Sequence, residues 1–246
     1  MMISPMIHKM LRREDLHRLV AEIARTDPTE AYPAARALES GRIHTLLDSP
    51  IALEVVRGGG GAPAALPLTL LWYVPIRAAL CERGELDIDL ADYTASLALV
   101  FLPSRANRRA ARGENAIAAW TRSCNALPAD SVARGECAAY CGSLALWWAG
   151  LFPRWVARGA NGTGMIKAYV DFAAGALAVA AHTLKRTAPN IAGVYIAAAS
   201  RTELLREALD EAGREYLGRE AHTANGRLNR YLARIKPAAH RRDRSD

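Results

Sequence analysis

Apolar residues recur along the 246-residue chain at the three- and four-residue spacing of a helix face. The clearest stripes fall within residues 68–80, 137–151 and 166–184, and each ends near a glycine or a proline. No stretch alternates between apolar and polar residues in the pattern of several strands. The pattern predicts an all-α fold, a multi-helix bundle whose helices are mostly antiparallel.

Two helices near the middle of the chain are predicted to form a hairpin. Gly84 ends the first helix, and Asp87 or Asp89 caps a second helix that runs to about Leu102. The short link between them favours an antiparallel arrangement. Pro75 lies inside the first helix and has no N–H for the carbonyl four residues back, which predicts a kink in this central helix.

The chain is interpreted as one helical domain, residues 1–246, with distinct parts. A stretch rich in Gly, Ala and Pro follows the first helices and is typical of a flexible connector. The parts are an N-terminal helical arm (1–57), the connector (58–66), the main bundle (67–236) and a charged tail (237–246).

The location of the protein is predicted from what the chain lacks. Its longest uninterrupted apolar run, residues 144–152, is half the length of about 18 residues that a membrane span needs, so no integral membrane association is expected. The N-terminal residues have neither the apolar core nor the cleavage site of a secretory signal. The expected location is the cytoplasm.

Cysteines provide the first candidate chemistry. Cys137 and Cys141 are one turn apart on a predicted helix, and a structural zinc site would need Cys124 and a distant histidine as well. Both lie on an apolar stripe, and cysteine is among the most buried residue types, so core packing is the preferred interpretation. We expect no metal and no other cofactor.

Other motifs predict no catalytic residue. The loop 159–164 has the outer glycines of a phosphate-binding loop, but Met165 and Ile166 stand where lysine and a hydroxyl residue belong. The six histidines are scattered, and no nucleophile, base and orienting group occur together. The sequence therefore favours a non-enzymatic protein.

Charge is distributed unevenly. Residues 105–246 hold 22 basic and 12 acidic side chains, whereas residues 1–104 hold 10 and 13. Arginine clusters of this kind suit nucleic acids and other polyanions, although a solvated helix face is the simpler interpretation. The clusters are Arg105, Arg108, Arg109 and Arg112, and on the last predicted helix Arg227, Arg230 and Arg234.

A candidate pocket lies on the predicted hairpin. Arg77 and Asp92 are at similar distances from its turn and are expected to face each other, either as a structural ion pair or as part of a polar binding pocket. In the second interpretation Arg77 holds a carboxylate or a phosphate, with Tyr73 one turn away and Tyr140 nearby.

Tryptophans provide a candidate interface. Trp147 and Trp155 are less well placed on a buried helix face than Trp72 and Trp148, so they are candidates for lining a groove or an interface, with core packing as the simpler interpretation.

Two segments, Leu70 to Phe101 and Gly150 to Val156, resemble a group of uncharacterised bacterial proteins. The resemblance implies a bacterial origin and a helical fold, and it implies no chemistry. The function that the sequence favours is a helical protein-interaction module that self-associates or docks a protein partner. The alternatives are a binder of nucleic acid or another polyanion and a ligand carrier or enzyme with a pocket in the bundle.

Overall fold

The computed structural model describes residues 3–58, 66–101, 116–157 and 164–214. Within these ranges the chain forms helices joined by turns, with no strand, and the helices pack against one another. The prediction of an all-α multi-helix bundle is confirmed.

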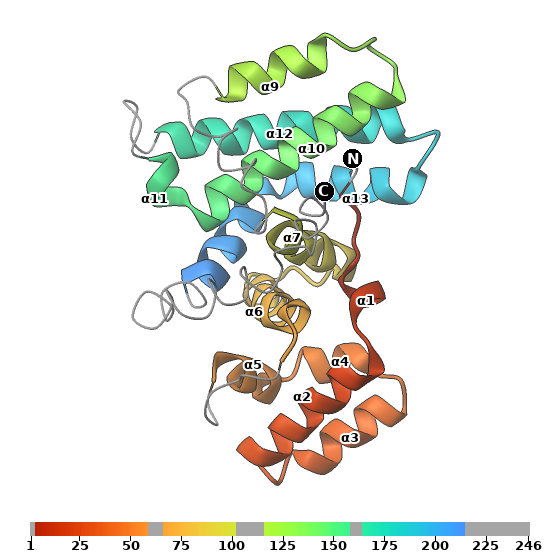
Figure 1. The fold of residues 1–246 in the computed structure, drawn as a ribbon, viewed down its shortest axis with the longest axis vertical. Helices are drawn as coiled ribbons and strands as arrows, with labels where there is room; N and C mark the ends of the chain where they lie inside the picture. The colour runs from red at the N-terminus through yellow and green to blue at the C-terminus, as the bar shows by residue number, and fades with distance from the viewer. Residues whose placement is uncertain (1–2, 59–65, 102–115, 158–163, 215–246) are drawn as a thin grey trace, which may run out of the picture.

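The first five helices form an N-terminal lobe, in which α2 to α5 lie at the bottom of Figure 1 and α1 lies above them, beside α6 and α7. Helix α5 begins where Ser49 accepts a hydrogen bond from the N–H of Ala52, and it ends at Gly58, whose φ of 87° is the left-handed conformation that glycine adopts readily. The lobe packs on the rest of the molecule mainly through α1 and α5. Its helices are α1 (Ile7–Met10), α2 (Arg13–Thr26), α3 (Ala31–Glu39), α4 (Ile43–Leu47) and α5 (Pro50–Arg57).

The predicted hairpin lies at the centre of the molecule as α6 (Leu68–Glu82) and α7 (Ile88–Phe101), which pack against each other. Gly84 ends the first helix with a φ of 78°, and the carboxylate of Asp87 accepts a hydrogen bond from the N–H of Leu90. Pro75 lies inside α6, as expected. Most side chains of both helices are buried, because the hairpin is covered by the N-terminal lobe on one side and by the later helices on the other.

The second half of the chain forms the upper layer in Figure 1. Helix α10 packs along α12, and α12 packs along α13. The layer comprises α9 (Ala116–Asn125), α10 (Val132–Leu151), α11 (Pro153–Val156), α12 (Gly164–Leu184), α13 (Pro189–Ser200) and a helical segment over residues 202–214.

Helix α12 is long and apolar, although it does not contain the longest uninterrupted apolar run of the sequence. Among the described helices it is the one whose length and apolar composition would suffice to cross a membrane, a property that core helices of soluble proteins share. Its buried stripe includes Tyr169, Ala173 and Leu177, and one third of its most apolar stretch is buried. The absence of integral membrane association stays a prediction.

Close packing at one end of α10 requires a glycine. A methyl group on Gly150 would lie 2.5 Å from the Cβ of Leu209 in the segment 202–214, and that atom cannot rotate away. We expect Gly150→Ala to lower the free energy of unfolding by about 1–3 kcal/mol because it overpacks this contact. The matched control is Gly175→Ala on α12, where the new methyl group meets nothing within 4 Å. Chemical denaturation should show this control to be stabilising by about 0.5–1 kcal/mol, and equal effects of the two substitutions would contradict the packing.

Candidate functional site

The carboxylate of Asp92, on α7, holds the N-terminal segment against the central hairpin. Its Oδ1 accepts hydrogen bonds from the backbone N–H groups of Met6 at 2.8 Å and Ile7 at 2.6 Å. Its Oδ2 accepts from the backbone N–H of His8 at 3.2 Å and contacts His8 Nδ1 at 2.7 Å. Because these N–H groups begin α1, they have no partners within that helix, and the carboxylate satisfies them.

This environment sets the ionisation of Asp92, which is 4% exposed. Burial by itself raises its pKa, but the hydrogen bonds from the His8 side chain and from the N–H groups of Ile7 and His8 outweigh burial and hold the pKa below its ordinary value of 3.8. The ionised carboxylate can only accept hydrogen bonds, so His8 Nδ1 carries the hydrogen. In the neutral ring, Nε2 is then an acceptor and a potential base.

Arg77 is paired with the N-terminal lobe. Its guanidinium is 4% exposed and donates to both carboxylate oxygens of Asp48, from Nε at 3.0 Å and from Nη2 at 3.2 Å. The expectation that Arg77 and Asp92 form an ion pair with each other is therefore wrong. Each has a partner from the first 48 residues, because the lobe folds over the hairpin and supplies both an acid and backbone donors.

Two aromatic rings complete the group. The ring of His8 lies 5.0 Å from that of Tyr73 and 4.8 Å from that of His44, measured between centroids. Burial raises the pKa of Tyr73, which keeps it a phenol, and burial together with the neighbouring His8 lowers the pKa of His44, which favours its neutral form. We name this group the N-terminal polar cluster: His8, His44, Asp48, Tyr73, Arg77 and Asp92.

Three buried polar atoms of the cluster have no hydrogen-bond partner among the described residues. They are Nε2 of His8, Oη of Tyr73 and Nη1 of Arg77. A buried polar atom without a partner costs about 1–3 kcal/mol, and native proteins contain few of them. Their occurrence on neighbouring side chains makes the cluster the candidate site. Two of the atoms are donors, and one of those donors is on a cation.

The structure brings together three of the four predicted pocket residues. Tyr73, Arg77 and Asp92 belong to the cluster, whereas Tyr140 on α10 packs edge-on against Phe101 at 5.6 Å. Phe101 is nine residues, or roughly 13 Å, along α7 from Asp92. The prediction was wrong for Tyr140 because the sequence does not show which turn of α7 faces α10.

Sequence reasoning missed three members of the cluster, His8, His44 and Asp48. Each lies in or beside a short helix of the lobe, where no long stripe fixes its orientation. One signal was present: His44 and Asp48 are four residues apart, which places them on the same side of a helical turn.

The predicted tryptophan interface is only partly accessible. Trp147 is 2% exposed and packs against Trp148 and Phe152 with centroid distances of 4.9 and 5.0 Å, so the expectation that it lines a groove or an interface is wrong. Trp155 is half-buried and lies 4.5 Å from Trp148. The seven arginines of the two predicted polyanion-binding clusters lie outside the described residues.

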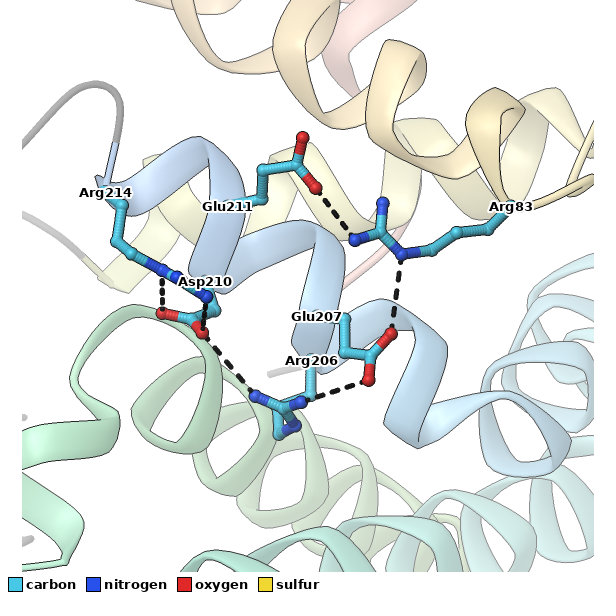
Figure 2. A pocket seen from close by; sticks show the side chains of 6 residues that line it. All are labelled: Arg83, Arg206, Glu207, Asp210, Glu211 and Arg214. Carbon is cyan, nitrogen blue, oxygen red and sulfur yellow. Dashed lines mark hydrogen bonds and ion pairs between the residues drawn. The ribbon is translucent and has the colours of Figure 1, made fainter.

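A second polar region, the hollow in Figure 2, is neutralised by its own residues. It has a volume of about 490 Å³, and its three cations and three anions are joined by ion pairs. Arg83, at the end of α6, contacts Glu207 at 3.4 Å and Glu211 at 2.8 Å, and its Nη1 donates to the carbonyl of Ala79 at 2.7 Å. Every nitrogen of that guanidinium has a partner. The hollow therefore has fewer unpaired groups to bind a ligand than the N-terminal polar cluster has.

The Asp92 contacts predict how stability depends on pH. Asp92→Asn removes the charge that faces three backbone N–H groups, and at pH 7 we expect it to lower the free energy of unfolding by about 3 kcal/mol. Because the pKa of Asp92 is lowered in the folded state, its contribution is present above about pH 4 and is lost as the pH falls through the lowered pKa. The difference between wild type and variant should therefore shrink in acid.

Urea denaturation between pH 2.5 and 7 measures this difference. The matched control is Asp89→Asn in the first turn of the same helix, where the side chain is exposed. It should change stability by under about 0.5 kcal/mol. A constant difference between wild type and Asp92→Asn across this pH range would contradict the role given to the carboxylate.

Comparison of the chain with protein-family models, with curated proteins and with solved structures gave no match.

Proposed function

We propose that the N-terminal polar cluster binds a small molecule through a carboxylate or phosphate group. The observation that carries this proposal is the set of three buried, unpartnered polar atoms on His8, Tyr73 and Arg77. An oxyanion supplies the acceptor oxygens that Nη1 of Arg77 and Oη of Tyr73 need. Nε2 of His8 accepts a hydrogen bond from the bound molecule or, when the ring is protonated, donates one.

The two carboxylates of the cluster repel such an anion only weakly, because the negative charge of each is already compensated by hydrogen-bond donors. Asp92 receives three backbone N–H groups and an imidazole, so little of its charge is uncompensated. Asp48 is bound at Nε and Nη2 of Arg77, and its side chain is 31% exposed, so water screens it. The remaining nitrogen, Nη1, is buried, where a charge-assisted hydrogen bond is stronger.

The exposed members of the cluster come from the N-terminal lobe. Its members His44 and Asp48 are exposed, and the side chain of His8 is 27% exposed. Tyr73 and Arg77 lie beneath them on α6. This arrangement resembles a binding site with a polar floor and a rim formed by short helices. The imidazole of His8 is held in place by Asp92, as the ring of an oriented base is.

The other functions considered from the sequence stay predictions. A protein-interaction function depended on Trp147 and Trp155, and the burial of Trp147 leaves Trp155 as its basis. Polyanion binding depends on arginines outside the described residues.

Tyr73→Phe tests the proposed binding site with little disturbance of the fold. The hydroxyl has no partner among the described residues, so its removal should leave the stability of the free protein unchanged or raise it. The same change should weaken binding of the anion by about 10-fold or more, because the lost hydrogen bond is to a charged group. Calorimetric titration of inorganic phosphate and of small mono- and dicarboxylates measures the binding.

Arg77→Gln should abolish that binding, and Arg83→Gln is the matched control. Both arginines are on or next to α6. Every nitrogen of Arg83 has a partner, and Arg83 follows Arg77 by six residues, which is more than one helical turn. Failure of the wild type to bind any of these anions, or equal effects of the two arginine substitutions, would overturn the proposal.

A further inference from the structure

Three of the four cysteines meet at the contact between α9 and α10. Cys124 lies near the end of α9, and Cys137 and Cys141 are one turn apart on α10. Their three sulfur atoms all lie within 4.8 Å of one another, and the Sγ atoms of Cys124 and Cys137 are 2.8 Å apart. Sequence spacing suggested the pair on α10, and the fold supplies the third thiol from another helix.

The packing around the thiols keeps the two helices in place. Trp120 on α9 packs against Tyr169 and Phe172 of α12, both at a centroid distance of 5.8 Å. At the end of α9, the side-chain oxygen of Asn125 accepts a hydrogen bond from Nη2 of Arg134 on α10. These contacts position the thiols before any ligand arrives, which lowers the entropy lost on binding.

The geometry suits a metal ion. Zinc binds thiolate sulfur at about 2.3 Å, so three sulfurs around a tetrahedral zinc ion lie roughly 3.8 Å apart. The three sulfurs of this chain all lie within 4.8 Å of one another, which is close to that spacing.

Charge favours a divalent ion. Three thiolates and one divalent cation carry a net charge of −1, and the nearby guanidinium of Arg134, which acts on Cys124 electrostatically, offsets it.

Contrary to the expectation from the sequence that these cysteines only pack in the core, we propose that Cys124, Cys137 and Cys141 form a three-thiolate site for a thiophilic divalent ion such as zinc. Binding breaks three S–H bonds, forms three metal–sulfur bonds and releases three protons to solvent, with no change in oxidation state. The fourth coordination position is occupied by water, as in zinc sites with three protein ligands. This site is independent of the N-terminal polar cluster, which contains none of these residues.

Titration of the reduced full-length chain with Cd²⁺, and in parallel with Zn²⁺, tests the site. We expect one ion per chain, an ultraviolet sulfur-to-cadmium charge-transfer band, release of close to three protons in weak buffer and a rise in melting temperature. Cys124→Ser and Cys137→Ser should each weaken binding at least 10-fold. The matched control is Cys81→Ser on α6, which should bind as the wild type does.

The wild-type stoichiometry and proton count keep the test decisive if a serine variant fails to fold. The absence of a charge-transfer band at micromolar cadmium, or equal loss of binding in Cys81→Ser, overturns the proposal. A third outcome also overturns it. If the protein binds no metal and loses the mass of two hydrogen atoms on exposure to air, two of the thiols form a disulfide instead of a metal site.

Discussion

The fold of the N-terminal third depends on one buried carboxylate. Asp92 reaches from the central hairpin to three successive backbone N–H groups and the imidazole of His8. A second contact, from Oη of Tyr195 on α13 to the carbonyl of Ile3 at 2.8 Å, fixes the same segment to the upper layer. Residues 3–8 therefore lie between the two halves of the molecule, and the lobe that follows is held where Asp48 meets Arg77.

The candidate binding site is a consequence of this attachment. His8 lies beside Tyr73 because the carboxylate orients its ring, and His44 is in place because α4 is next to α1 and α6. Residues more than 80 positions apart in the chain thus form a single cluster. The lobe contributes three of its side chains, and the hairpin contributes the other three. Arg77 and Arg83 show the difference between a site and a structural network, since one guanidinium keeps a buried nitrogen unpaired and the other is fully paired.

The sequence predicted what repeats along a helix and missed what depends on contacts between distant segments. Stripes and caps identified α6, α7, α10 and α12. Of the two caps predicted for α7, Asp87 accepts the hydrogen bond and Asp89 lies inside the helix. Tyr73, Arg77 and Asp92 were recognised as polar residues in an apolar hairpin, but their partners His8 and Asp48 lie in or directly after short helices without strong periodicity. The same limit applies to Cys124, whose meeting with Cys137 depends on how α9 packs on α10.

Amide hydrogen exchange at Ile7 and His8 tests the central role of Asp92 most directly. If the carboxylate holds these N–H groups, both amides of the wild type exchange at least 100-fold more slowly than in an unstructured peptide, because they open only when the segment detaches. In Asp92→Asn the protection of both should fall by 10-fold or more while that of Leu97, within α7, is kept. Exchange of Ile7 and His8 at the unstructured rate in the wild type would contradict the account.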